Sequence, residues 1–259
     1  YKRQEEICAE ISLGGKKDVD KAVSAAKKAF ETWAFSKKEE RLDLLEKLYV
    51  IYKKRWAEMA KLISLEMGAP MKFSTEMQAA TGASHIKSFK NILKDFKFEK
   101  DLGEEKNNQK LLYEPKGVCA LITPWNWPIN QVNLKVIPAL ASACTVVLKP
   151  SEIAPLSSML LAEMIDEVKF PTGVFNLVNG DGEITGNALT SHPDIDMISF
   201  TGSTRAGALI SQNAAKDFKR ISLELGGKGA NIIFKDADSE AIARGVLRCF
   251  RNSGQSCNA

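Results

Sequence analysis

The sequence predicts an α/β fold, namely a Rossmann-like parallel sheet with helices on both faces, preceded by a helical N-terminal segment. From Leu111 onward, short β-rich runs alternate with helical patterns, which is typical of right-handed βαβ crossovers. In addition, the motifs that carry chemistry each follow a predicted strand, where parallel sheets bind their ligands. The first hundred residues, by contrast, have apolar residues at helical spacing.

Three helical segments are expected in the first hundred residues, at 18–33, 42–65 and 71–93. Asp18 is the expected N-cap of the first of them, because a short acidic side chain can accept from the free N–H groups of a first turn. The second segment is expected to end near Gly68, since Gly-Ala-Pro is a stop signal. The polar stretch 100–110 is expected to be a turn or connector between strands.

The alternating region is expected to contain five strands, at 118–123, 145–149, 174–178, 197–201 and 221–225. The helices expected between them are 130–142, 155–168, 184–191 and 205–216. A further strand at 231–234 and a helix at 238–250 follow, and we interpret them as the opening of a second α/β domain.

Composition narrows the class of protein. The chain has 259 residues, 44% hydrophobic and 26% charged, which is ordinary for a soluble globular protein. The net charge of +4 is small, and basic residues are interleaved with acidic ones, so we expect no nucleic-acid partner. No apolar run approaches the roughly 20 residues of a transmembrane helix, so we expect no membrane association.

Cysteine usage favours a reducing compartment. Five cysteines, an odd number, are widely spaced without a Cys-x-x-Cys pattern, and with two histidines they offer no zinc-ligand cluster. We therefore expect free thiols, no metal site and a cytoplasmic location. Because the sequence begins without Met and stops two residues after Cys257, we expect it to have been cut at both ends.

The loop 124–128, Pro-Trp-Asn-Trp-Pro, follows the first predicted strand of the sheet. Its prolines and tryptophans would hold the Asn126 amide in place, and a fixed side-chain N–H is what an oxyanion hole requires. Taken alone, the loop is better explained as a structural turn packed by two aromatic side chains.

Two further strand ends carry residues suited to a nucleotide. Lys149 and Glu152 could bind ribose hydroxyls, and Glu152 favours NAD over NADP because it would repel a 2′-phosphate; a polar strand-to-helix turn explains them equally well. The small and hydroxyl residues of 200–207 would let a pyrophosphate approach a helix N-terminus. Near Gly180 the glycines resemble a dinucleotide pattern, but their spacing is one residue too long.

Glu224 and Cys257 are the candidate base and nucleophile. A carboxylate at the end of an apolar strand is costly unless it is paired or used, so Glu224 could activate water, although a salt-bridged structural role explains it too. Cys257 could instead be an unreactive buried thiol. A Cys–His hydrolase would need His85 or His192 as base, and neither looks positioned for that role.

Together these motifs resemble the aldehyde dehydrogenase superfamily, NAD(P)-dependent enzymes that act through a cysteine thiohemiacetal, over essentially the whole chain. The segments that carry the resemblance are 123–128, 149–152, 200–203, 224–227 and 254–257. The resemblance implies that Cys257 is the nucleophile, that Asn126 and the Cys257 backbone N–H form the oxyanion hole, and that Glu224 activates the deacylating water. The cofactor-binding residues that it implies are Thr123, Pro124, Trp125, Lys149, Ser151, Glu152, Gly180, Phe200, Thr201, Gly202, Ser203, Leu225 and Gly226.

The resemblance further implies an aldehyde substrate, NAD as cofactor with NADP less favoured, and a homodimer or homotetramer if the protein is full length. Residues 1–226 would form the NAD-binding domain, with 1–96 mostly helical, 97–116 an oligomerisation-type connector and 117–226 the Rossmann-like core. Residues 227–259 would start the catalytic domain. Family members are roughly twice as long, so activity of this chain alone is not expected. The alternatives are a CoA-acylating aldehyde dehydrogenase and a non-catalytic nucleotide-binding fragment.

Overall fold

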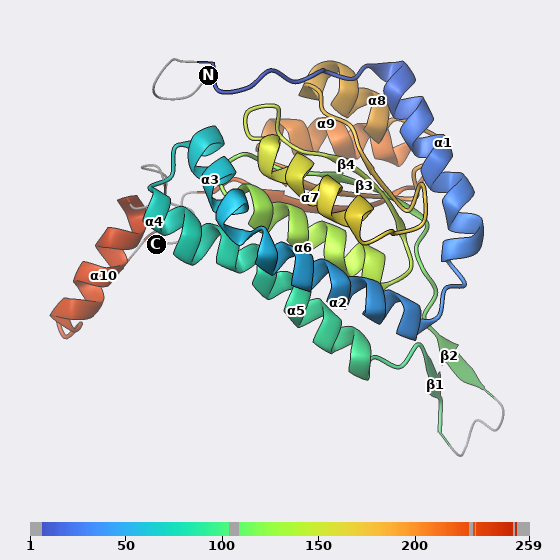
Figure 1. The fold of residues 1–259 in the computed structure, drawn as a ribbon, viewed down its shortest axis with the longest axis horizontal. Helices are drawn as coiled ribbons and strands as arrows, with labels where there is room; N and C mark the ends of the chain where they lie inside the picture. Colours follow the sequence, from blue (N-terminus) through green and yellow to red (C-terminus); the bar gives the residue numbers. More distant parts are fainter. Residues whose placement is uncertain (1–6, 104–108, 228–229, 231, 251, 253–259) are drawn as a thin grey trace.

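The computed structural model describes residues 7–103, 109–227, 230, 232–250 and 252. At its centre is a five-stranded sheet of order β5-β4-β3-β6-β7, in which every neighbouring pair is parallel (Figure 1). The strands are β3 (Val118–Ile122), β4 (Thr145–Lys149), β5 (Phe175–Leu177), β6 (Met197–Gly202) and β7 (Arg220–Leu225). The predicted α/β fold with a parallel sheet is therefore confirmed.

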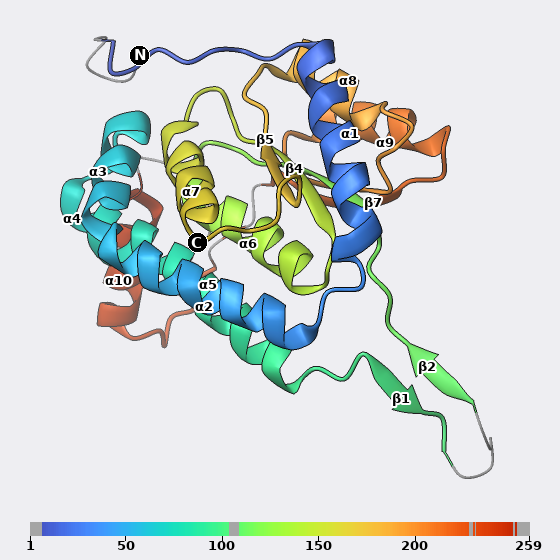
Figure 2. The ribbon, with the colours of Figure 1, turned by 45° about the vertical axis from the view of Figure 1, so that its right-hand side comes forward.

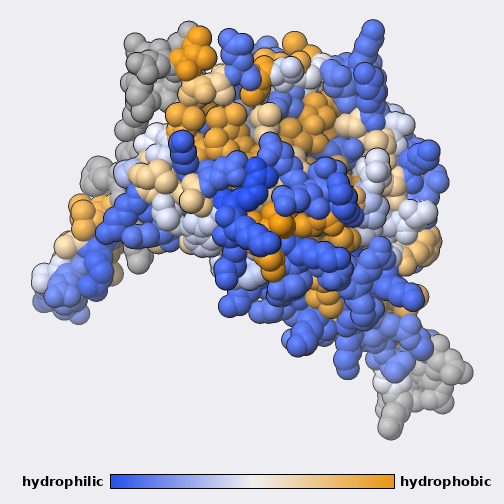
Figure 3. Space-filling model, viewed as in Figure 1, coloured by the Kyte–Doolittle hydropathy of each residue, from blue (hydrophilic) through white to orange (hydrophobic). Residues whose placement is uncertain are grey.

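Helices cover both faces of the sheet (Figures 1 and 2). One face packs against α6 (Pro128–Ala141) and α7 (Leu156–Glu167), with α2 (Lys38–Lys54), α3 (Trp56–Met67) and α5 (Ala79–Asp95) outside them. The other face packs against α1 (Lys16–Trp33), α8 (Asn187–Thr190) and α9 (Thr204–Ala215). The outer helices α2 and α5 present mainly hydrophilic side chains in Figure 3, as helices that border solvent do.

Strand alternation divides the interior into two cores. In β3, Cys119 and Leu121 point into the core of the α6 face, whereas Val118, Ala120 and Ile122 point into the core of the α9 face. Successive side chains of a strand point to opposite faces, and all five of these are buried. Because β3 is apolar on both sides, it occupies the centre of the sheet, with β4 and β6 beside it.

The remaining elements lie outside this sandwich. Strands β1 (Glu99–Asp101) and β2 (Lys110–Leu112) form an antiparallel pair that projects from the body, so the connector predicted at 100–110 does join two strands (Figure 2). The helix α10 (Ser239–Phe250) follows the last strand, as predicted. Between α3 and α5, a short helix α4 (Met71–Phe73) leads into a π-helix η1 (Ser74–Gln78), and a second π-helix η3 (Gly182–Gly186) precedes α8.

Three local predictions are wrong. Asp18 is the third residue of α1 rather than its N-cap; Gly15 is the N-cap, and the Gly15 N–H donates to the Asp18 carboxylate at 3.0 Å. The long second helix is broken at Arg55 into α2 and α3. Residues 232–234 form no strand, and their large apolar side chains are exposed, because they pair with no strand in the described part of the chain.

Candidate functional site

The carboxyl ends of the central strands bring most of the predicted site residues to one edge of the sheet. Ile122 at the end of β3 pairs with Lys149 on β4 and with Phe200 on β6. One position further along, Thr201 on β6 pairs with Glu224 on β7. Because these strands are parallel and in register, the loops that follow them open at the same edge, where doubly wound sheets bind ligands.

Glu224 lies on the α6 face of this edge. Ile198 and Phe200 of β6 are buried in the core of the α9 face, so the alternating residues Ser199 and Thr201 point toward α6. Residues that are paired in a parallel ladder point to the same face, and Glu224 is paired with Thr201. The Glu224 side chain is exposed in this chain, so it is open to the space beyond the sheet edge.

Lys135 on α6 lies on the same face as this carboxylate, close enough to be influenced by its charge, and was not predicted as a site residue. Its ammonium donates to the Ser199 hydroxyl at 2.9 Å. Burial lowers the pKa of Lys135 to about 8, and the Glu224 carboxylate opposes that shift by favouring the charged ammonium. A signal was present in the sequence, since Lys135 is the only charged residue in the otherwise apolar and amide-bearing α6.

The loop that carries Asn126 is fixed by its aromatic neighbours, and it enters α6 with Pro128 at the first helical position. The Trp127 ring nitrogen donates to the Thr81 hydroxyl at 3.1 Å, and the Trp127 and Phe73 rings pack edge to face with centroids 5.6 Å apart. The Asn126 carboxamide oxygen is buried without a hydrogen-bond partner among the described residues. The loop is therefore rigid, and it keeps an unsatisfied polar group at the sheet edge.

Lys149 is buried on the other face of the sheet, at 3% exposure. Its ammonium donates to the carbonyl of Gly180 at 2.6 Å and to that of Pro150 at 3.1 Å, and it lies 3.5 Å from the Glu152 carboxylate. Burial lowers the pKa of Lys149, and Glu152 opposes the shift. Lys149 thus ties the loop after β4 to the loop after β5, while the Glu152 side chain, 43% exposed, extends toward solvent.

The start of α9 lies on the same face as Lys149. Ser203 is the N-cap, and its hydroxyl accepts from the Ala206 N–H at 3.2 Å. Gly207 in the first turn packs so closely on Leu225 of β7 that an added Cβ would lie 2.7 Å from a Leu225 methyl group. On the opposite face, the Thr201 hydroxyl oxygen is buried without a partner in the described part of the molecule; the Thr123 hydroxyl oxygen is likewise buried and unpartnered there.

Gly180 is packed against the π-helix η3. A Cβ on Gly180 would lie 2.0 Å from the Thr185 hydroxyl oxygen, so only glycine fits there without a shift of η3. The Asp181 carboxylate caps η3 by accepting from the Ile184 N–H at 2.6 Å. Of the three glycines 180, 182 and 186, only Gly180 is therefore required by close packing where the chain turns into η3.

Cys257 lies outside the described residues, so its position relative to these groups stays a prediction. The two histidines that a Cys–His hydrolase would need both have other partners. His85 on α5 is hydrogen-bonded to the Asn130 side chain at 2.7 Å, and the His192 ring lies 3.6 Å from Asp20 on α1.

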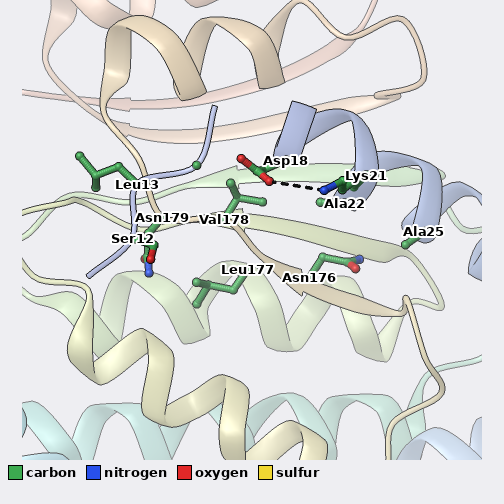
Figure 4. Close-up of a pocket in the computed structure, with 11 residues that line it drawn as sticks. Ser12, Leu13, Asp18, Lys21, Ala22, Ala25, Asn176, Leu177, Val178 and Asn179 are labelled. Atoms are coloured by element: carbon green, nitrogen blue, oxygen red, sulfur yellow. Dashed lines mark ion pairs between the residues drawn. The ribbon is translucent and has the colours of Figure 1, made fainter. Parts of the chain in front are cut away.

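A cavity of about 520 Å³ lies beside β5, between the N-terminal segment, α1 and the end of that strand (Figure 4). Ser12, Leu13 and Asn179 are among its lining residues, and none of the predicted catalytic or cofactor residues lines it. Within the described ranges, no helix is long and apolar enough to cross a membrane. The same residues hold no group of three or more His, Cys, Asp or Glu side chains that could bind a metal ion.

The molecule is thus a doubly wound α/β protein whose candidate ligand groups gather at the carboxyl edge of a parallel sheet. A model of the aldehyde dehydrogenase family matches residues 2–259, and the chain belongs to that family. It is 52% identical over 257 residues to a 3-succinoylsemialdehyde-pyridine dehydrogenase from a Pseudomonas species, covering 98% of this chain and 53% of that protein. The chain therefore spans about half the length of the curated relatives it matches.

Solved structures of the family have the same fold. An aldehyde dehydrogenase from Bartonella henselae matches with a TM-score of 0.95 and 61% identity, covering 98% of this chain and 54% of that one. A mutant aldehyde dehydrogenase C from Pseudomonas syringae, crystallised with NAD+ and octanal, matches with a TM-score of 0.94 and 47% identity, covering 98% and 52%. NAD+ is thus bound in a close structural neighbour.

Proposed function

We propose that this chain supplies the cofactor-binding half of an NAD-dependent aldehyde dehydrogenase of about twice its length, which oxidises an aldehyde to a carboxylic acid. The observation that carries the proposal is the register at the sheet edge, where Thr201 pairs with Glu224 and Phe200 pairs with Ile122. It gathers the Asn126 loop, the start of α9 and the Glu224 carboxylate at one edge. The proposal is also supported by the NAD+ found in a structural neighbour of the same family.

The residues of the α9 face fit a dinucleotide. The N-terminus of α9 offers backbone N–H groups to a pyrophosphate. Gly207, in the first turn of α9, packs closely on Leu225 and has no side chain, so only its backbone is present there. The exposed Glu152 carboxylate is suited to ribose hydroxyls and unfavourable for a 2′-phosphate. The buried hydroxyl oxygens of Thr123 and of Thr201, the latter on the α6 face, have no partner among the described residues and remain available to a ligand. Bound NAD would supply the hydride acceptor.

The residues of the α6 face fit the acyl chemistry. Cys257, as thiolate, would add to the aldehyde carbonyl, and the Asn126 amide would stabilise the oxyanion of the thiohemiacetal. After oxidation to the thioester, Glu224 would take a proton from the water that releases the carboxylic acid.

The Glu224→Gln variant of the full-length protein tests this assignment. Without the base, acylation still proceeds, so we expect a burst of NADH close to one per active site and a steady-state rate reduced by about a hundredfold. Addition of CoA to the same assay checks the acyl acceptor. A steady-state rate unchanged from wild type would remove Glu224 from deacylation. A rate that CoA restores in the variant and increases in the wild type would indicate an acylating enzyme.

Glu152→Ala tests the cofactor assignment independently of turnover. We expect the dissociation constant for NAD to rise by about tenfold, because two hydrogen bonds to ribose hydroxyls would be lost, each worth roughly 0.5–1.5 kcal/mol. Ser151→Ala, at the neighbouring position of the same turn, measures how much the turn itself contributes. An unchanged dissociation constant in Glu152→Ala would exclude it from the ribose site.

A further inference from the structure

Two buried amide side chains connect distant segments to the Asn126 loop. Gln78, the last residue of η1, is 0% exposed, and Asn252, beyond α10, is 3% exposed. The Gln78 amide nitrogen donates to the Asn252 carboxamide oxygen at 2.7 Å. The Asn252 amide nitrogen in turn donates to the backbone carbonyl of Asn126 at 3.0 Å. The contact therefore joins three parts of the chain that are far apart in sequence.

The Asn126 carbonyl can only accept, so it sets which way the Asn252 amide faces, and Gln78 supplies the donor to the remaining Asn252 oxygen. A carboxamide has one oxygen acceptor and one nitrogen donor, so the oxygen that accepts from Gln78 leaves the nitrogen directed at the Asn126 carbonyl. The Gln78 nitrogen also contacts the Met67 sulfur at 3.4 Å, which holds the Gln78 amide in the same orientation. Both side chains are buried, so a residue at position 78 that could not donate would leave the Asn252 oxygen without a hydrogen bond.

The same part of the molecule holds the next residue of the loop. The Thr81 hydroxyl accepts from the Trp127 ring and donates to the Gln78 carbonyl at 2.8 Å. The end of the π-helix η1 and the first turn of α5 thus fix the loop at two successive residues, 126 and 127. π-helical turns are rare and frequently lie at functional sites, where the extra residue re-aims a side chain.

We propose that Gln78 and Asn252 are positioning residues, which align the Asn126 loop with the segment that carries Cys257, five residues after Asn252 in the sequence. The inference rests on the proposed function, because alignment matters only if Asn126 and Cys257 act on one carbonyl. Within the described residues, the contact to the loop is made through the Asn126 backbone carbonyl, so both amides are assigned a positioning role. Their role is to hold the oxyanion donor and the nucleophile in register, since a misplacement of about 1 Å can cost a hundredfold in rate.

The test uses Gln78→Glu and Asn252→Asp in the full-length protein. When ionised, the carboxylate introduced by Gln78→Glu could only accept, so at a pH above its pKa the Asn252 amide would turn its nitrogen toward it and present its oxygen to the Asn126 carbonyl. Asn252→Asp removes the donor to that carbonyl directly. For both we expect kcat to fall by about tenfold to a hundredfold with KM for NAD within twofold of wild type. Alkylation of Cys257 by iodoacetamide should slow in the same variants.

A matched control is Asn176→Asp, because the Asn176 amide also donates to backbone carbonyls, of Gly173 at 2.8 Å and Val146 at 3.1 Å, but on strand β5. We expect its kcat to stay within twofold of wild type. Gln78→Met, which keeps the length and packing of the side chain without its amide, replaces Gln78→Glu if that variant does not fold.

Four outcomes decide the matter. A selective loss of kcat in the Gln78 and Asn252 variants supports the inference. A folded Gln78 variant with the kcat of wild type overturns it, and so does an equal loss in Asn176→Asp, which would indicate a general loss of stability. A wild-type protein that forms no NADH from any aldehyde would instead overturn the proposed function.

Discussion

Lys149 is a buried lysine and Lys135 a half-buried one, and the structure predicts opposite effects of replacing each by methionine. The Lys149 ammonium satisfies two buried backbone carbonyls, at 2.6 and 3.1 Å, whereas the Lys135 ammonium has one hydroxyl partner at 2.9 Å. Hydrogen bonds to a charged group contribute about 1.5–3 kcal/mol each, so two such bonds amount to about 3–6 kcal/mol. Lys149→Met also removes the cost of burying a charge, a cost indicated by the lowered pKa of Lys149, and this offsets part of the lost hydrogen-bond energy.

We therefore expect Lys149→Met to reduce the free energy of unfolding by about 2–4 kcal/mol. The Glu152 contact contributes little of this, since a pair with one exposed partner at 3.5 Å is worth about 0–1 kcal/mol. Urea unfolding, followed by circular dichroism, measures the difference. Lys135→Met is the matched control, and its free energy of unfolding at neutral pH should equal or exceed that of wild type.

The reasoning would be refuted if Lys149→Met unfolded with the wild-type midpoint and slope. That result would mean that the Gly180 and Pro150 carbonyls find water or other donors without cost. A large loss in Lys135→Met would equally contradict the distinction between the two lysines.

Three further predictions concern Lys135, Glu66 and Gly117. Because of Lys135, the free energy of unfolding should rise with pH. The pKa of Lys135 is about 8, below the ordinary 10.5, so the cost of burying its charge is absent above pH 10.5 and complete once the pH has fallen through about 8. Lys135→Met should abolish this pH dependence in thermal melts. Glu66→Gln should reduce the free energy of unfolding in urea by about 2–3 kcal/mol. The Glu66 carboxylate is 2% exposed and accepts from the Leu156 N–H at 2.6 Å and from the Ser157 N–H at 3.3 Å, at the start of α7. A reduction under about 0.5 kcal/mol would contradict this expectation. Gly117→Ala should destabilise the protein by at least about 2 kcal/mol. Gly117 has φ +126, and an added Cβ would lie 2.0 Å from the Asp196 carboxylate. An unchanged melting temperature would be inconsistent with that geometry.

The sheet and its order of elements could be predicted because each strand is short, apolar and followed by a helical pattern. Predicted and observed bounds of β4 coincide, and those of the other four strands differ by one residue at one or both ends. The strand predicted at 231–234 failed for a physical reason: β-rich composition fits a pleated surface, but a strand also needs a neighbour to pair with. The prediction of one long helix in place of α2 and α3 was wrong for another reason: the bend at Arg55 leaves the spacing of apolar residues almost unchanged, so the sequence pattern does not reveal it.

The candidate site was predicted as a set of motifs, and its division between two faces was not. Lys149 and the start of α9 lie on one face of the sheet, and Glu224 and Lys135 on the other. Sequence gives the order of strands along the chain, but the register that pairs Thr201 with Glu224 comes only from tertiary structure. Gln78 and Asn252 were missed because an isolated amide carries no sequence signal.

The central claim is that this chain belongs to an enzyme in which Cys257 attacks an aldehyde while NAD is bound. The most direct measurement is NADH formation by the full-length protein with NAD and a panel of aldehydes, for wild type and Cys257→Ala, with NAD binding measured on both. We predict that wild type forms NADH and that Cys257→Ala binds NAD without forming any. NADH formation that survives in Cys257→Ala would contradict the account.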